Sequence, residues 1–215
     1  MDITFLCSDT NHPVHPWIDD WVARHGDAHR VRVLRHARDL AAGDLLFLIS
    51  CAEIVREHQR SAFRHSLVVH ASDLPRGRGW SPHVWDILNG ATQLTLSLLE
   101  AADPVDSGRV WRQVRFDVPR HALWDEINRL LFAATFELVD YAVAHADDVK
   151  PQPQDATITP TYHRRRTPAD SALDVGKSIA EQFDLLRICD PDRFPAYFDH
   201  LGHRYKLILE KIDAR

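Results

Sequence analysis

His70 stands at the point in the chain where a side chain that exchanges protons would be most useful. It follows the apolar run Leu67-Val68-Val69 and precedes a loop with two prolines and two glycines at 71–82. A short apolar run bounded by chain breakers is typical of a buried strand, and open α/β sheets bind ligands beyond the carboxyl ends of their strands. Because imidazole titrates near neutral pH, His70 could act there as a general acid or base. A histidine held by hydrogen bonds inside the core is the alternative.

A second group of residues that could bind a ligand is the basic cluster Arg164-Arg165-Arg166, which follows His163. Planar guanidinium groups can grip a diphosphate through paired hydrogen bonds or stack on a planar base. A solvated turn ahead of a helix is the other interpretation, and these residues taken alone favour it.

The residues that could bind metal or form disulfides are scattered. His12 and His15 have no third ligand at a suitable spacing, so the sequence predicts no metal site. The cysteines Cys7, Cys51 and Cys189 are far apart and form no C-x-x-C pair, which favours reduced thiols in the core.

The elements around His70 alternate between strands and helices. Short apolar runs predict strands at 3–7, 31–34, 44–50 and 67–70, and helical patterns lie between them at 17–25 and 53–63. Range 44–50 is apolar on both faces, as a strand inside a parallel sheet requires. This order predicts an α/β fold with a Rossmann-like, doubly wound, mainly parallel sheet and helices on both faces.

The second half of the chain predicts two further strands, a long helix and an extension. Alternating patterns predict strands at 92–100 and 109–118, a helix lies at 83–89, and an amphipathic pattern at 121–145 predicts a longer one. The proline-rich range 149–160 reads as a linker. A threonine cap followed by proline at 167–168 opens a helical region that continues with interruption to 190.

Composition excludes several functional classes. The chain is 45% hydrophobic and 27% charged, and it has no apolar run long enough for a membrane span. Its net charge of −5 argues against a general nucleic-acid binder. The first strand is not followed by the G-x-G-x-x-G fingerprint of dinucleotide binding. The N-terminus lacks the pattern of a signal peptide, so we expect a cytoplasmic protein.

Three motifs resemble those of the folate-dependent formyltransferases. They are H-A-S-D-L-P-R-G-R-G-W-S-P at 70–82, V-D-S-G at 105–108 and R-R-T-P at 165–168, the last resembling members that act on nucleotide-linked amino sugars. The resemblance covers most of range 44–205. It implies an enzyme that transfers a formyl group from 10-formyltetrahydrofolate to the amine of a nucleotide-linked amino sugar.

The resemblance also implies the roles of individual residues. His70 would exchange protons with the reacting groups, and Asp106 would orient its ring or an ordered water. We expect no metal. The expected folate-binding residues are Leu48, Ile49, Ser50, Cys51, Asp103 and Val105, and the expected substrate-binding residues are Arg78, Trp80, Tyr162, Arg165 and Arg166.

The resemblance further implies a division of the chain and its partners. A catalytic domain is expected at 1–148, a linker with the basic substrate-side segment at 149–166, and a small helical extension at 167–215. The amphipathic extension could pair two subunits as a homodimer. We expect a small-molecule substrate and no nucleic acid, because the chain ends at Arg215 and leaves little room for a basic RNA-binding domain.

Val68 departs from the family pattern. The family has an asparagine two residues before the histidine, and its amide donates a hydrogen bond to the oxyanion that develops during formyl transfer. Loss of such a donor typically costs about a hundredfold to a thousandfold in rate. Ser66, Ser72 or backbone N–H groups of the glycine loop could replace it. A non-catalytic relative that binds folate or a nucleotide sugar is therefore an alternative, as is an enzyme for another small amine such as glycinamide ribonucleotide.

Overall fold

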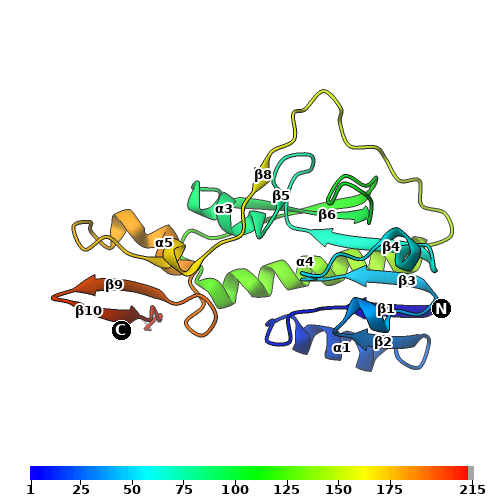
Figure 1. Cartoon of the computed structure of the whole chain (residues 1–215), viewed down its shortest axis with the longest axis horizontal. Helices are drawn as coiled ribbons and strands as arrows, with labels where there is room; N and C mark the ends of the chain where they lie inside the picture. Colours follow the sequence, from blue (N-terminus) through cyan, green and yellow to red (C-terminus); the bar gives the residue numbers. More distant parts are fainter. Residues whose placement is uncertain (213–215) are drawn as a thin grey trace.

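The computed structural model describes residues 1–212, which form a six-stranded sheet with the order β2-β1-β3-β4-β6-β7 (Figure 1). Strands β1 to β4 are parallel to one another, whereas β6 pairs antiparallel with both β4 and β7. The predicted mainly parallel α/β sheet is therefore confirmed. The strand bounds are β1 Asp2–Leu6, β2 Arg30–Leu34, β3 Gly43–Leu48, β4 Phe63–His70, β6 Gln93–Glu100 and β7 Val110–Asp117.

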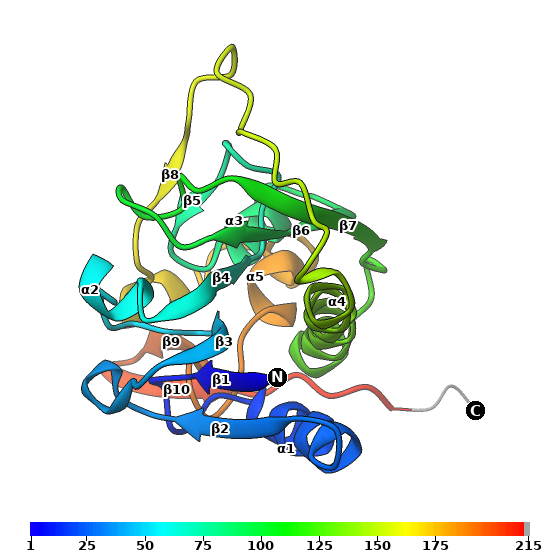
Figure 2. The same ribbon diagram turned by 90° about the vertical axis from the view of Figure 1, so that its right-hand side faces the viewer.

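Helices lie on both faces of the sheet, but they differ greatly in length (Figure 2). The long helices α1 (His15–His25) and α4 (Trp124–His145) cover one face, and the short α2 (Glu57–Arg60) and the 3-10 turn η1 (Ala37–Asp39) cover the other. No helix within residues 1–212 is long and apolar enough to cross a membrane. The remaining helical elements are α3 Pro82–Leu88, α5 Phe183–Arg187, η2 Pro168–Ser171 and η3 Ala180–Gln182.

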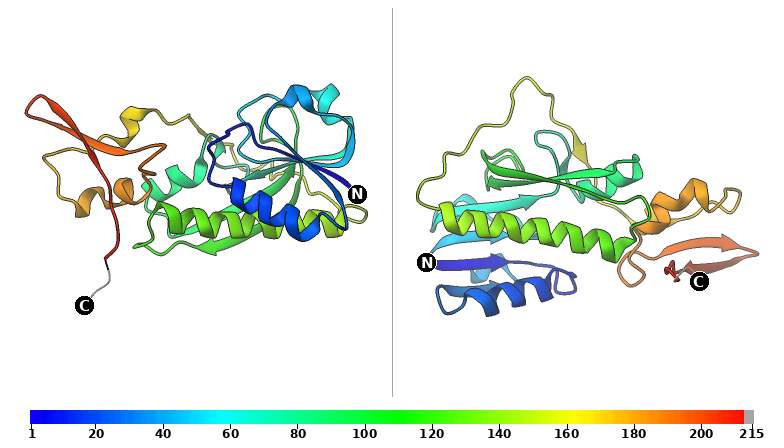
Figure 3. Two further views of the ribbon diagram at one scale, coloured as in Figure 1. Left: turned by 90° about the horizontal axis from the view of Figure 1, so that it is seen from below. Right: turned by 180° about the vertical axis from the view of Figure 1, so that it is seen from behind.

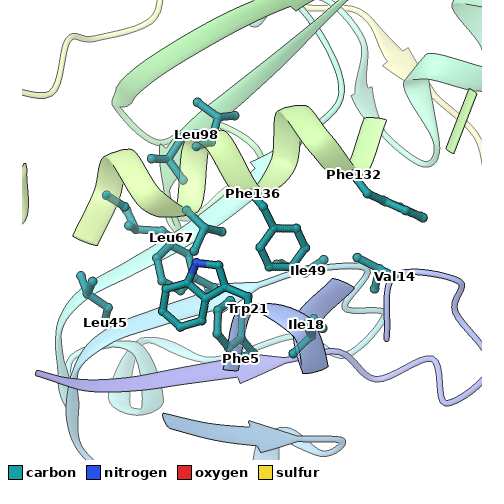
Figure 4. Close-up of a cluster of buried hydrophobic side chains, with 14 of the residues drawn as sticks. Phe5, Val14, Ile18, Trp21, Leu45, Ile49, Leu67, Leu98, Phe132 and Phe136 are labelled. Carbon is teal, nitrogen blue, oxygen red and sulfur yellow. The ribbon is translucent and has the colours of Figure 1, made fainter. Parts of the chain in front are cut away.

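Aromatic packing between the sheet and its two long helices forms the main core (Figure 4). The ring of Phe5 stacks on Phe47 with centroids 5.3 Å apart and meets the edge of Trp21 at 5.2 Å. Neighbouring residues of a strand point to opposite faces, so Leu6 and Leu46 pack in a separate cluster on the other side. Burial on both faces explains the unbroken apolar pattern of β3.

The helix predicted at 53–63 is wrong over most of its length. Only α2 is helical, and the residues before it form a loop. The carboxylate of Glu53 accepts hydrogen bonds from the Ala37 backbone N–H at 2.8 Å and from His36 Nδ1 at 3.0 Å. These contacts with η1 hold the loop out of helical geometry, so tertiary structure overrides local propensity.

The extension contains less helix than predicted and ends in a β-hairpin. Strands β9 (Ala196–His200) and β10 (His203–Leu207) pair through the turn Leu201-Gly202, where φ is +49° and +81°. Two consecutive positive φ values define the tight turn that suits a two-residue hairpin. Figure 3 shows this hairpin at the end of the molecule opposite the N-terminus.

The extension is packed against the body of the protein. Arg187 is only 1% exposed and donates to the carbonyl oxygens of Pro119 and Ala122, just before α4. Ile188 shares a hydrophobic cluster with α3 and α4. The domain boundaries at 148 and 166 stay predictions.

The proline-rich range arches over the sheet and is tied to the loops below it (Figure 1). Gln152 forms a backbone bridge with Val110, and β8 (Tyr162–His163) pairs with β5 (Arg78–Gly79). The side-chain amide of Gln154 donates to the carbonyl oxygens of Asp106 and Gly108 at 2.8 and 2.9 Å. This range therefore braces the loops that follow β4 and β6.

Candidate active site

The carboxyl ends of β1, β3 and β4 open into a cavity of about 930 Å³. This size is typical of a site that encloses a small molecule. The loops after β1, β3, β4 and β6 form its walls, together with the first half of α4 and part of the extension. Its apolar lining includes Leu48, Ile49, Ile87, Leu96, Ile127, Leu131 and Phe132.

His70 is the last residue of β4, and its buried ring lies in the cavity wall. Its Nε2 is 2.8 Å from the carbonyl oxygen of Gly77. Because a carbonyl can only accept, Nε2 must carry a proton and donate it. The other nitrogen, Nδ1, is 3.6 Å from Asp106 Oδ1. That separation is longer than a direct hydrogen bond but within the distance of an ion pair between a carboxylate and a protonated ring.

Asp106 is held in place by the loop that covers His70. Its backbone has φ of +60°, and its Oδ2 accepts the backbone N–H of Gly79 at 2.9 Å. Gly79 has φ of +94°, and a Cβ there would lie 2.4 Å from the carbonyl oxygen of His163. Glycine at 79 is therefore needed for the β5–β8 pairing, and this pairing fixes the carboxylate beside His70.

All six residues expected to bind folate line the cavity: Leu48, Ile49, Ser50, Cys51, Asp103 and Val105. Ser50 has φ of +49°, which turns the chain sharply after β3. Arg60 pairs with the carboxylate of Asp103 at 2.5 Å and joins the loops after β3 and β6. The three cysteines are free, and two of them, Cys7 and Cys189, are buried.

Four of the five residues expected to bind substrate also line the cavity: Trp80, Tyr162, Arg165 and Arg166. Trp80 is 41% exposed, and the guanidinium carbon of Arg165 lies 4.8 Å from the centre of its ring. Two segments distant in sequence thus place an aromatic surface and positive charge side by side.

Arg78 does not line the cavity, and its contact with substrate stays a prediction. It is buried, and its Nη2 donates to Gln154 Oε1 at 2.6 Å while its Nη1 lies 3.2 Å from the Tyr162 hydroxyl. Its guanidinium ties range 149–166 to the loop after β4. Only the fold brings these partners together, so sequence spacing could not distinguish a brace from a ligand contact.

Neither serine proposed as a replacement for the missing amide reaches the cavity. The Ser66 hydroxyl donates to the Arg60 carbonyl oxygen at 2.9 Å, and Ser72 is buried outside the cavity. Val68 itself lies in the cavity wall with His70.

Two further histidines, His12 and His83, lie in the cavity wall; sequence reasoning considered His12 only as a metal ligand and did not consider His83. Burial lowers the pKa of His83 to about 4, helped by the charges of His12, His70 and Arg166. Burial and the charge of Arg193 lower the pKa of His12 to about 4. His83 directly follows the last proline of the motif at 70–82, which was the available sequence signal. No cluster of three or more potential metal ligands occurs within residues 1–212.

The fold and the cavity define an α/β protein with a buried His–Asp pair at the carboxyl edge of its sheet. No protein-family model matches the chain. Solved structures give the particular fold: methionyl-tRNA formyltransferase from Clostridium thermocellum matches with a TM-score of 0.81 and 16% identity, over 99% of this chain and 94% of that one.

Two further structures have the same architecture. HypX from Aquifex aeolicus, in complex with tetrahydrofolic acid, matches with a TM-score of 0.80 and 21% identity over 96% of this chain and 37% of HypX. A sugar N-formyltransferase from a Shewanella species matches with a TM-score of 0.74 and 15% identity over 100% and 99% of the two chains. The protein therefore has the formyltransferase fold.

Proposed function

We propose that this protein is an N-formyltransferase that moves a formyl group from 10-formyltetrahydrofolate to the amine of a nucleotide-linked amino sugar. The observation that carries the proposal is the buried His70–Asp106 pair, which lies in the wall of a cavity large enough for both reactants. The fold is shared with formyltransferases of two substrate classes. The negative net charge and the motif at 165–168 favour the sugar class over tRNA.

The folate side of the proposal rests on the shape and lining of the cavity. A pterin ring is flat, its faces can pack on apolar side chains and its edge has hydrogen-bonding groups, so it suits apolar walls with backbone groups within reach. Residues 48–51 and the loop at 101–106 provide such walls on two sides. When bound there, 10-formyltetrahydrofolate would supply the formyl group.

His70 is placed to handle the protons of the reaction. Its Nε2 proton is committed to the Gly77 carbonyl, so the lone pair on Nδ1 is available to accept a proton. The substrate amine forms a bond to the formyl carbon and gives up one proton, while the bond from that carbon to the folate nitrogen breaks and this nitrogen gains one proton. Asp106, 3.6 Å from Nδ1, would stabilise the imidazolium that exists between the two transfers.

Trp80, Tyr162, Arg165 and Arg166 would bind the nucleotide. An exposed aromatic ring can stack on a base, and two arginines can pair with a diphosphate. Arg166 Nη2 also donates to the Ser171 hydroxyl at 3.1 Å, which anchors this side of the site to the extension.

The experiment that tests this proposal is a binding screen followed by product analysis. We expect one of UDP-, dTDP-, GDP- or CMP-linked amino sugars to raise the melting temperature in the presence of a folate. Mass spectrometry should then detect formylated amine from the same compound. Stabilisation by a nucleotide sugar and a folate with no formylated product would support the alternative function, a non-catalytic binding protein, which Val68 favours.

A further inference from the structure

Val68, in the cavity wall with His70, occupies the position from which the family donates a hydrogen bond during formyl transfer. Negative charge develops on the formyl oxygen during the reaction, and a valine side chain at 68 cannot donate to it. Ser66 and Ser72 do not reach the cavity. The backbone N–H groups of Gly77 and Gly79 already donate to Thr161 and Asp106, so we look for a replacement donor in another element of the wall.

His83 lies in the wall of this cavity. It follows Pro82 in the first turn of α3 and lines the same cavity as Val68 and His70. His12, His70 and Arg166 line the same cavity, so His83 lies among the polar groups of its wall.

One nitrogen of the His83 ring is also free of hydrogen bonds to the described residues. Its Nδ1 is buried and has no hydrogen-bond partner among residues 1–212. A buried acceptor lone pair without a partner is tolerated better than a buried N–H without one. The favoured neutral tautomer therefore carries its proton on Nε2. With a pKa of about 4, the ring is neutral at physiological pH, so it can donate one hydrogen bond without introducing a charge.

We propose that His83 donates its Nε2–H to the formyl oxygen and supplies the hydrogen bond that the family obtains from an amide at the position of Val68. This inference rests on the proposed formyl transfer. The proton stays on His83 throughout: the formyl oxygen gains electron density as the amine adds to the carbon and returns it as the folate nitrogen leaves. His83 therefore changes the rate and is not consumed or protonated.

Substitutions at 83 separate a donor from a packing residue. His83→Leu removes the donor, and His83→Gln places an amide nitrogen near the position of Nε2. We expect His83→Leu to lower kcat by about a hundredfold or more with KM for both reactants within about threefold, and His83→Gln to recover at least about a tenth of the activity. Val68→Asn in the His83→Leu background should also raise kcat, because it restores the donor from the other side. His58→Leu, at an exposed site outside the cavity, is the matched control.

A second readout does not depend on turnover. Ring-nitrogen NMR of the ¹⁵N-histidine-labelled protein should show His83 neutral at pH 7 with its proton on Nε2. A charged ring, or a proton on Nδ1, overturns the inference. Activity of His83→Leu within about threefold of wild type overturns it and leaves formyl transfer intact. A loss that neither amide recovers returns His83 to a packing role. Absence of transfer by the wild type removes both proposals.

Discussion

At the residue scale, Asp106 depends on a backbone that few residues adopt. Its positive φ and its bond from the Gly79 N–H fix the carboxylate, so its geometry is set before any ligand arrives. Asp106→Asn keeps an oxygen for the Gly79 N–H but removes the charge that faces His70. We expect kcat to fall by about a hundredfold or more while the melting temperature changes little. Circular dichroism melts and steady-state rates check both parts, and near-wild-type kcat would remove Asp106 from the mechanism.

The three adjacent arginines are predicted to behave differently from one another. Arg165 lies over the exposed ring of Trp80, whereas Arg164 lies outside the cavity and pairs with Asp170. Arg165→Ala should raise KM for the sugar nucleotide by roughly threefold to thirtyfold and leave folate affinity unchanged, because only uniform binding is lost. Arg164→Ala is the matched control, with KM expected to stay near the wild-type value. Equal effects of the two variants would contradict a nucleotide contact at Arg165.

The family resemblance pointed to residues that the fold brings together. His70, Asp106 and the six residues expected to bind folate all line one cavity, and their roles stay predictions. Arg78 has the same kind of motif support, but it bonds to Gln154, a contact that sequence spacing could not predict because only the fold brings the two residues together. Sequence reasoning missed His83 because only the packed structure shows that its Nδ1 has no hydrogen-bond partner among the described residues.

At the element scale, the β5–β8 pairing connects the glycine loop to the substrate side of the site. Gly79→Ala would place a Cβ 2.4 Å from the His163 carbonyl oxygen at a φ of +94°. Gly90→Ala is the matched control, because Gly90 has φ of +85° and no atom within 4 Å of the added Cβ. We expect urea unfolding to show Gly79→Ala less stable than Gly90→Ala by about 1–3 kcal/mol. Equal stability of the two variants would mean that the β5–β8 pairing can shift to accept the added Cβ with little loss of folding free energy.

Local pattern predicted the strands and the long helix α4 but not the elements defined by distant contacts. The helix α4 could be predicted from its amphipathic pattern, because its apolar face is the face that packs on the sheet. The helix predicted at 53–63 is displaced by the bonds of Glu53 to η1, and the β9–β10 hairpin turns at Leu201, a residue type that rarely adopts positive φ.

At the scale of the whole molecule, the two cavity histidines should make stability depend on pH. Burial lowers the pKa of His12 and of His83 from 6.5 to about 4, so the unfolded chain binds more protons between these values. The free energy of unfolding should therefore fall as pH decreases from 6.5 to 4, by up to about 3 kcal/mol for each histidine.

Urea titrations across this pH range check the prediction, with a His12→Gln, His83→Gln double variant as control. The variant should have a flatter profile than the wild type. Carboxylates with lowered pKa values, including Asp170 beside Arg164 and Glu126 beside Lys211, lose their contribution mainly at lower pH, so the two effects are separable. A wild-type stability that stays constant from pH 6.5 to 4 would contradict the burial of these neutral rings.

The most direct test of the account is single-turnover formyl transfer by the wild type and by His70→Asn. Each enzyme would be mixed in excess with 10-formyltetrahydrofolate and the amino-sugar nucleotide found in the binding screen, and the formylated amine would be followed by mass spectrometry. We expect the wild type to form product and His70→Asn to do so at least about a hundredfold more slowly, with folate affinity within about threefold. Equal rates would exclude His70 as the proton-transferring group. Bound folate and nucleotide sugar with no product from the wild type would contradict formyl transfer itself.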